Sequence, residues 1–207
     1  MRQAGTPARA QAKAQAKGGR GWRRALPHLL PWALVLAGAA TAAQAAWIPL
    51  KAQLAQVLLD RAFAESVERG EPVKPWNWAD TAPLARVSVE RLGVGEVVLS
   101  GGSGEAMAFG PTALVDGGPA RVTVLAAHRD THFRFVRDLR AGDAIALERI
   151  DGSVARYRVR SLSTVRWDRF AYPAGGSTEL LALATCYPFD SDRPGPLRRI
   201  AWAERVG

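Results

Sequence analysis

The chain has one cysteine, Cys186, in a position that favours reactivity over burial. It follows the apolar run LLALAT, which starts at Leu180, and it precedes Tyr187-Pro188. We therefore expect it where a strand gives way to a turn. A lone cysteine is most often a small buried side chain, and it cannot form an intramolecular disulfide bond. At a strand end, however, its thiolate can act as a nucleophile.

A histidine occupies a similar position further upstream. His128 ends the apolar run from Val122 to Ala127, so we expect it at a strand end as well. An imidazole beside a thiol can serve as general acid and base, and the two residues predict a cysteine–histidine active site. The alternatives are a structural histidine at the rim of the fold, or a metal ligand together with Asp130 and His132. Two or three such residues on one turn are weak evidence for a metal.

The segments that must position these residues have the sequence pattern of β-strands. After residue 84 the runs ARVSVE, EVVLSG, RVTVLAA, AIALERI, VARYRVRSLSTVRW, ELLALATC and RRIAWAERV follow one another. Ala141-Gly142-Asp143 predicts a turn before one strand, and Asp151-Gly152 predicts a hairpin turn between two others. Seven or eight short strands with short helices predict a mainly β fold, either a sandwich or a closed barrel.

The basic charge of the chain is concentrated near its start. The formal net charge is +9, but residues 1–50 hold seven Arg and Lys and no acidic residue, which leaves 21 basic and 19 acidic side chains in the remainder. A nucleic-acid-binding domain would carry its basic patch on the folded part, so we expect no nucleic acid partner. The chain is 48% hydrophobic and 207 residues long, enough for one domain with its own core plus an appendage.

The first fifty residues predict a membrane anchor. We interpret residues 1–24 as a basic cytoplasmic tail and residues 25–50 as a transmembrane signal anchor. The 22 residues from Leu29 to Leu50 carry no formal charge, and a helix of this length crosses the hydrocarbon core of a bilayer. Trp32 and Trp47 lie near its ends, where aromatic rings favour the membrane interface. The basic residues on the amino side predict that the tail stays in the cytoplasm and the rest is exported.

A cleaved signal peptide is the alternative, because Ala43-Gln44-Ala45 resembles a small-x-small cleavage site. Both interpretations export the remainder. Residues 51–83 then form a juxtamembrane helix and linker. Lys51 to about Val67 has apolar residues at helical spacing, and the prolines after it end the helix.

Three features in order resemble the sortase family of cysteine transpeptidases. A strand ends in Leu-Ala-Thr-Cys at Cys186, a histidine follows an upstream strand at His128, and the strand after the cysteine carries Arg198. AHRDTHF from Ala127 resembles the family's segment around its catalytic histidine, and PLRRI from Pro196 resembles its closing strand. Upstream, PWNWADT from Pro75 and FGP from Phe109 resemble the Gram-negative branch, class GN. The resemblance covers roughly residues 47–207.

The resemblance implies a closed sortase-type β-barrel in residues 84–207, preceded by the transmembrane helix. It implies Cys186, His128 and Arg198 as catalytic residues, and a substrate groove lined by Thr185, Ala184 and Ala182. Many sortases carry Thr-Leu-x-Thr-Cys; here the first threonine position is Ala182, so any contact made by that hydroxyl is missing. No cofactor is implied, and no calcium-loop pattern is present.

The implied function is cleavage of a C-terminal sorting motif in an exported protein and transfer of that protein to an amine acceptor. The implied location is the inner (cell) membrane, crossed once, with the catalytic domain on the periplasmic side. One alternative is another exported cysteine enzyme that acts on peptidoglycan peptides, of the L,D-transpeptidase type. That family resembles Ser-x-Gly-Cys, which Ala184-Thr185-Cys186 does not fit. The other alternative is a non-catalytic surface scaffold module.

Strand alternation gives two further expectations. Cys186, Ala184 and Ala182 should share the face that carries substrate, while Leu181 and Leu183 fill the barrel interior. With alanine at position 182, this groove should be roomy. Arg198 and Arg199 should likewise point to opposite faces, so only one of them can face the groove. The resemblance aligns Arg198 with the catalytic position.

Overall fold

The computed structural model describes residues 22–118, 121–173, 177–191 and 193–206. The predicted basic tail lies almost entirely outside the described residues. The chain divides into two compact units, residues 1–49 and residues 50–207, and each is described by itself.

One helix, α1 (Trp22–Arg69), accounts for the described part of the first unit and continues into the second. Every residue from 30 to 50 is exposed, and the helix contains a stretch near the N-terminus that is apolar enough to cross a membrane. A signal sequence passes the same test, so the helix is compatible with either interpretation. The predicted anchor and juxtamembrane helix are therefore one continuous element, in keeping with its many alanine and leucine residues.

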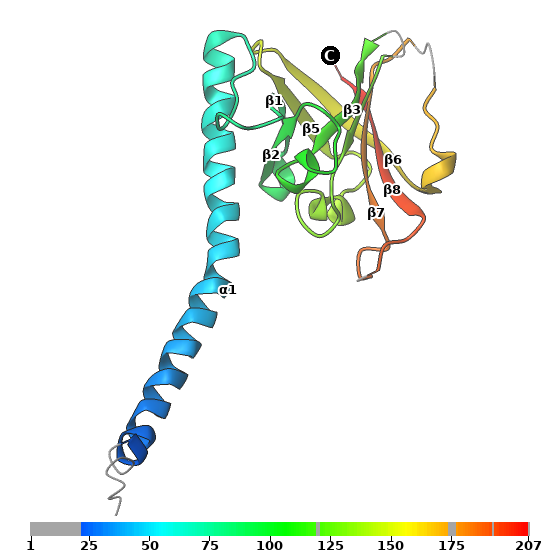
Figure 1. Cartoon of the computed structure of the whole chain (residues 1–207). Helices are drawn as coiled ribbons and strands as arrows, with labels where there is room; N and C mark the ends of the chain where they lie inside the picture. The colour runs from blue at the N-terminus through cyan, green and yellow to red at the C-terminus, as the bar shows by residue number, and fades with distance from the viewer. Residues whose placement is uncertain (1–21, 119–120, 174–176, 192, 207) are drawn as a thin grey trace, which may run out of the picture. The chain divides into compact units, whose positions relative to one another are not determined.

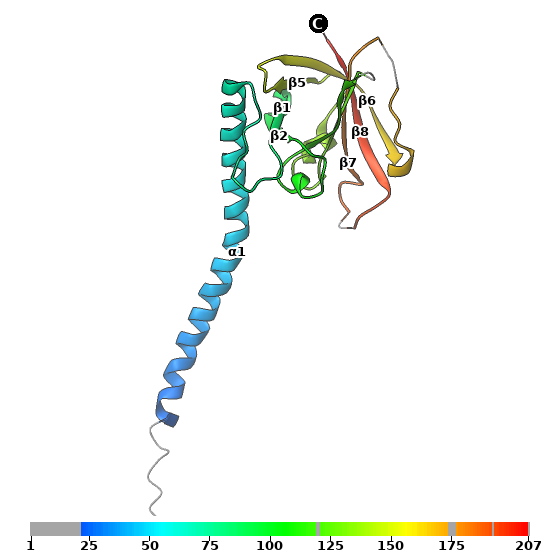
Figure 2. The same ribbon diagram turned by 45° about the horizontal axis from the view of Figure 1, so that its top comes forward.

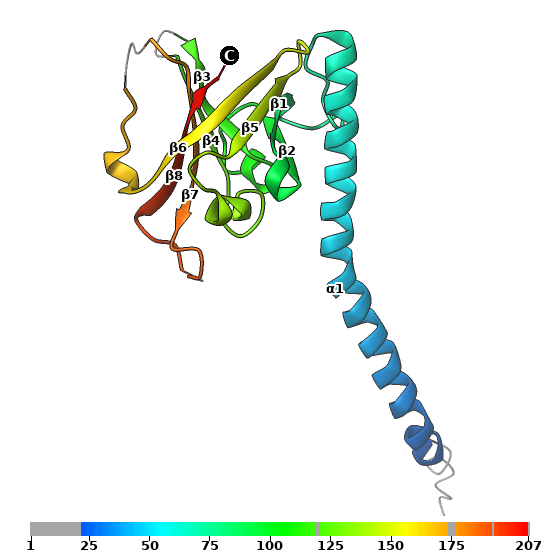
Figure 3. The same ribbon diagram turned by 180° about the vertical axis from the view of Figure 1, so that it is seen from behind.

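The second unit is built on a closed barrel of eight strands (Figures 1 and 3), which confirms the predicted barrel. The strand order is β1-β2-β3-β4-β7-β8-β6-β5, and β5 pairs with β1 to close the ring. The strands are β1 (Pro83–Val89), β2 (Val94–Leu99), β3 (Thr112–Gly117), β4 (Val122–Ala126), β5 (Ala144–Arg149), β6 (Val154–Arg166), β7 (Leu180–Tyr187) and β8 (Leu197–Arg205).

Within the described residues, short 3₁₀ helices lie in the connections at η1 (Glu90–Leu92), η2 (Ala106–Ala108), η4 (Arg134–Asp138) and η5 (Trp167–Arg169). The barrel interior is filled mainly by aliphatic side chains from alternate strand positions, and Phe133 from the β4–β5 connection is buried in the same cluster. Leu181 and Leu183 belong to this core and are fully buried, as alternation predicts.

The predicted hairpin at Asp151-Gly152 is present between β5 and β6, with Gly152 at a positive φ of 78°. One strand was not predicted. β3 follows Gly110-Pro111 and ends at Gly117, with Gly118 after it, and these turn residues make its short apolar stretch look like a loop in the sequence. It pairs mainly with β4, and only Thr112 pairs with β2.

The last turns of α1 pack on the barrel next to β1 and β2 (Figure 3). Leu59 and Phe63 are buried against Val97 and Leu99 of β2. The guanidinium carbon of Arg86 lies 4.7 Å from the centre of the Phe63 ring. The juxtamembrane helix is therefore part of the domain and not a free stalk.

Candidate active site

Three neighbouring strands bring the predicted catalytic residues to one rim of the barrel. β4 and β7 are parallel, with Ala126 opposite Ala184, and the Ala127 amide extends the ladder by donating to the Ala184 carbonyl at 3.3 Å. His128 and Cys186 each lie two residues beyond that last pair. The carboxyl ends of both strands therefore meet at the same edge, with His128 just after the end of β4 and Cys186 in the last two residues of β7.

Arg198 reaches the same edge from β8. β7 and β8 are antiparallel neighbours (Figure 2), and Cys186 pairs directly with Arg198. Directly opposed residues have Cβ atoms about 4.5–5.5 Å apart and project from the same face of the sheet. Arg199 pairs with Thr185 instead, so it lies on the other face, where it donates to the Thr164 hydroxyl at 3.2 Å.

The three side chains differ in exposure. His128 is exposed, whereas Cys186 and Arg198 are half-buried. Nη1 of Arg198 donates to the carbonyls of Gly195 and Leu197, both at 2.8 Å. In the part of the chain that the structure describes, Nε and Nη2 of Arg198 make no hydrogen bond, and no carboxylate pairs with this guanidinium. Two guanidinium nitrogen atoms of the residue that pairs with Cys186 are therefore left without a partner among the described residues.

Thr185 has a different position from the one implied by the resemblance. Its side chain is 2% exposed and lies on the opposite face from Cys186. Its hydroxyl donates to the Ala127 carbonyl at 2.8 Å and is not available to the groove. The residue before the cysteine thus binds the residue before the histidine, which fixes the ends of β4 and β7 to each other.

Arg129, the residue after His128, binds the loop that follows Cys186. This role was not predicted from the sequence. Its side chain is only 6% exposed. Nη1 donates to the Pro188 carbonyl at 2.9 Å, and Nη2 donates to the carbonyls of Ser191 and, at 3.0 Å, Arg193. The residue after the histidine therefore holds the loop that follows the cysteine. The only sequence signal was its place next to His128, because an arginine in a loop reads as a surface charge.

The segment after His128 is anchored at its far end as well. The Phe133 amide donates to the His128 carbonyl at 3.0 Å, and the Phe133 ring is fully buried. Nδ1 of His132 lies 2.7 Å from a carboxylate oxygen of Glu96 on β2. The backbone that carries His128 is consequently fixed on both sides.

Along β7 from Cys186 back toward Leu180, the outer face of β4, β7 and β8 is apolar. Ala184 is half-buried there, but Ala182 is fully buried in a cluster with Val122, Val124 and Ile200. Phe170 covers this cluster and stacks on Trp202 with ring centres 5.9 Å apart. The structure therefore does not bring Ala182 to the surface, and its contact with substrate stays a prediction that would require this cover to move.

The opposite rim of the barrel holds arginines in a different setting. Glu179, just before β7, accepts hydrogen bonds from Arg205 and, at 3.4 Å, from Arg121. The hydrogen bond from Arg205 holds the pKa of Glu179 below its ordinary value. Arg149 forms a two-pronged ion pair with Asp116 at 2.7 and 3.0 Å. All three arginines are paired with carboxylates.

Among the described residues, no group of three or more histidine, cysteine, aspartate or glutamate side chains is arranged to hold a metal ion. His132 is paired with Glu96 and does not join His128 and Asp130 in a common ligand set.

Comparison with known proteins identifies the family. The sortase domain family matches residues 87–206, which is more than half of the chain, so this chain belongs to the sortase family. Members of this family are cysteine transpeptidases. No curated protein matches the chain.

Solved sortases have the same fold. Sortase A from Corynebacterium diphtheriae superimposes with a TM-score of 0.55 at 19% identity, over 63% of each chain, so this protein spans less than two thirds of that sortase. Sortase C-1 from Actinomyces oris gives 0.51 at 23% identity, over 60% of this chain and 75% of that one. Sortase C1 from Streptococcus agalactiae, solved with MTSET, gives 0.53 at 22% identity, over 60% and 68%. At these identities the likeness shows the fold.

Proposed function

We propose that this protein cleaves a C-terminal sorting motif in an exported protein and joins the new carboxyl end to an amine. One observation carries this proposal: the strand register that sets Cys186 opposite Arg198 and places His128 and Cys186 each two residues beyond the Ala126–Ala184 pair of β4 and β7. The function follows from a nucleophile, a proton carrier and a hydrogen-bond donor at one edge.

In the first half of the reaction, the Cys186 thiolate attacks a backbone carbonyl of the motif and forms a tetrahedral intermediate. The two open donors of Arg198 stabilise its oxyanion or hold the backbone of the motif. His128 then gives a proton to the leaving amine, the C–N bond breaks, and a thioester joins Cys186 to the substrate.

In the second half, an acceptor amine attacks the thioester. His128 takes a proton from this amine, an amide bond forms, and the Cys186 thiolate is released. Each step exchanges one acyl bond for another, so the cycle needs no oxidant and no cofactor. The half-buried position of Cys186 and the exposed position of His128 suit groups that must meet two successive substrates.

We further propose that the chain is a class GN sortase anchored once in the inner membrane, with residues 51–207 in the periplasm. The support is the basic tail before an uncharged helix and the PWNWADT and FGP stretches. A periplasm-dependent reporter fused after Gly207 should be active. Activity of a reporter that works only in the cytoplasm would contradict this topology.

The experiment that tests the chemistry is covalent trapping. The full-length protein is incubated with a sorting-motif peptide that carries an electrophile in place of the scissile amide, and the adduct is mapped by mass spectrometry. The motif is taken from an exported protein encoded beside this gene that ends in a motif, an apolar span and a basic tail. We expect one adduct, on Cys186, and none in Cys186→Ala. Cleavage of the authentic substrate by Cys186→Ala would refute the mechanism.

A further inference from the structure

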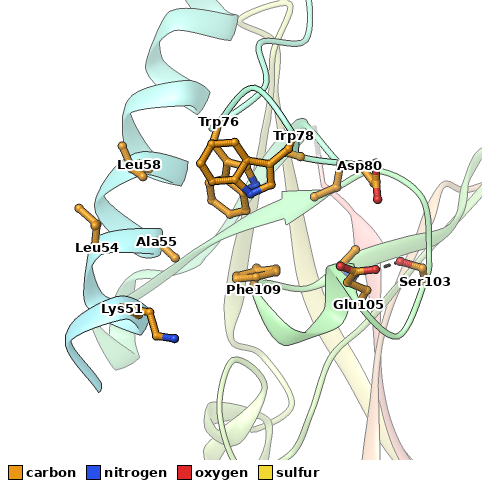
Figure 4. Close-up of a pocket in the computed structure, with 13 residues that line it drawn as sticks. Lys51, Leu54, Ala55, Leu58, Trp76, Trp78, Asp80, Ser103, Glu105 and Phe109 are labelled. Atoms are coloured by element: carbon orange, nitrogen blue, oxygen red, sulfur yellow. Dashed lines mark hydrogen bonds between the residues drawn. The ribbon is translucent and has the colours of Figure 1, made fainter. Parts of the chain in front are cut away.

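A pocket of about 390 Å³ lies in the second unit, away from the residues of the active site. It is formed by the part of α1 that begins at Lys51, by the linker around Trp76 and Trp78, and by the η2 turn with Phe109 (Figure 4). Pockets of roughly 300–1,000 Å³ are typical of small-molecule sites in proteins. None of the chemistry proposed for Cys186 uses this space.

The walls of the pocket are apolar and fixed by contacts of their own. Trp76 and Phe109 meet edge to face, with ring centres 5.2 Å apart. The Phe109 carbonyl accepts a hydrogen bond at 2.9 Å from Gln56 of α1, which ties the η2 turn to the helix. Leu54 and Leu58 complete the helix side (Figure 4). The pocket is therefore preformed and suited to an apolar group.

Charged side chains of both signs lie around these walls. Lys51 stands at the helix side, while Asp80 and Glu105 lie across the rings from it (Figure 4). A ligand that complements this arrangement has an apolar part for the walls and a head group with both a negative and a positive charge. Trp78, at 82% exposure, lines the same pocket and offers an amphipathic ring of the kind found at membrane interfaces.

An exposed apolar stripe connects the pocket to the end of the predicted span. Leu50, Leu54 and Val57 are 57–62% exposed and are spaced four and three residues apart, so they lie on one face of α1. Leu50 ends the uncharged run. Because α1 is continuous here, Leu54 lies four residues, or about 6 Å along the helix axis, from Leu50. The head-group layer on each side of the hydrocarbon core is about 5–8 Å thick, so this residue of the pocket lining is within reach of the bilayer surface.

We propose that this pocket takes up one acyl chain of a zwitterionic phospholipid from the surrounding bilayer. The chain lies against Trp76, Phe109 and Leu58, the phosphate faces Lys51, and the ammonium group faces Asp80 and Glu105. Binding is non-covalent. The proposal rests on the membrane anchor described under the proposed function, but it is independent of the reaction at Cys186.

Photolabelling of the full-length protein in nanodiscs tests this site. The probe is phosphatidylethanolamine with a diazirine at the end of one acyl chain, and labelled residues are mapped by mass spectrometry. In a free lipid the chain end lies near the bilayer midplane, so it can label only residues of the span. A chain in the pocket labels residues 76–81 or 105–109 instead. We expect labels there, and fewer when the probe has the anionic phosphatidylglycerol head group. Labels confined to residues 29–50 would overturn the proposal.

A matched pair of variants locates the site. Leu54→Trp fills part of the pocket and should lower labelling of residues 76–81 and 105–109 about tenfold, since excluding two methylenes of the ligand costs roughly that much affinity. Val57→Trp changes an equally exposed residue that does not line the pocket, and labelling should stay at the wild-type level. Equal effects of both variants would contradict the assignment.

Trp78→Ala provides a second test, because a side chain so exposed can be removed without disturbing the core. It should also reduce labelling, and unchanged labelling in both Leu54→Trp and Trp78→Ala would refute the site. Cys186→Ala should be labelled like the wild type. A failure of this inference with intact trapping at Cys186 would leave the proposed reaction standing, and the reverse result would leave the lipid site standing.

Discussion

The two ends of strand β8 carry arginines that differ in their partners. At one rim, Arg198 pairs with Cys186 in the strand register, and one of its guanidinium nitrogens, Nη1, donates to two backbone carbonyls. At the other rim, about 20 Å away along the strands, Arg205 is paired with the Glu179 carboxylate. An arginine with a carboxylate partner is satisfied and supports the fold. An arginine with nitrogen atoms left over beside the proposed nucleophile suits the proposed stabilisation of a charge that appears only during the reaction.

The largest expected effect is the loss of activity when Cys186 or His128 is replaced at the proposed active-site rim. Cys186→Ala should abolish formation of the acyl-enzyme, and His128→Ala should reduce turnover by about 10²–10⁴-fold, the usual contribution of a general acid–base group. Turnover is measured with the authentic exported substrate, and folding is checked by circular dichroism. Substantial turnover by Cys186→Ala would mean that this rim is not the reactive one.

Changing arginine to lysine at each end of β8 sharpens the comparison. Arg198→Lys should lose about 10²–10³-fold in kcat/KM, because a point charge cannot replace a planar fork that binds an oxyanion. Arg205→Lys should leave kcat/KM unchanged. Arg199→Lys is the closest control, since its side chain lies on the other face of the same strand. Equal losses in Arg198→Lys and Arg199→Lys would contradict the register.

A smaller effect is expected for Arg129, which acts through the loop after the nucleophile. Arg129→Met removes the donors to three carbonyls and should lower the free energy of unfolding by about 1.5–3 kcal/mol. As a positioning residue it should also reduce kcat more than it raises KM, and Arg129→Lys should restore part of both. Thermal melts and steady-state kinetics on the two variants decide this. A loss of stability with an unchanged kcat would make Arg129 purely structural.

The smallest effect concerns the ion pair between Glu179 and Arg205 at the opposite rim, and it depends on pH. The pKa of Glu179 is lowered mainly by the hydrogen bond from Arg205. A lowered pKa in the folded state contributes stability that is complete above the unfolded value, about 4.3, and is lost as the pH falls through the folded value. Stability should therefore decline below about pH 5, and Glu179→Gln should flatten part of that decline without changing activity at neutral pH. Denaturant unfolding from pH 3 to 7 measures it, and an unchanged slope would contradict this role for the pair.

The sequence predicted the barrel and the rim well because both depend on local patterns. Alternating apolar runs indicated seven of the strands, and the ends of two of them indicated the positions of Cys186 and His128. β3 was missed because glycine and proline on both sides concealed a strand that is held by its neighbour β4.

Residues whose surroundings come from distant segments were harder to predict. Ala182 is buried in a cluster against which Phe170 packs, and Phe170 comes from the β6–β7 connection, whose position alternation along β7 does not predict. A larger side chain at position 182 would therefore overpack this cluster and not fill an open groove. Thr185 and Arg129 likewise take their roles from carbonyls about 60 positions away in the chain.

Strand β8 closes the barrel and also carries Arg198, so one strand completes both the fold and the proposed active site. It pairs with β6 on one side and β7 on the other, and the ring cannot close without residues 197–205. A variant truncated after Pro196 should therefore show no trapping of Cys186 by the electrophilic peptide. Under the proposed function, the nucleophile would become reactive only in a chain whose barrel has closed.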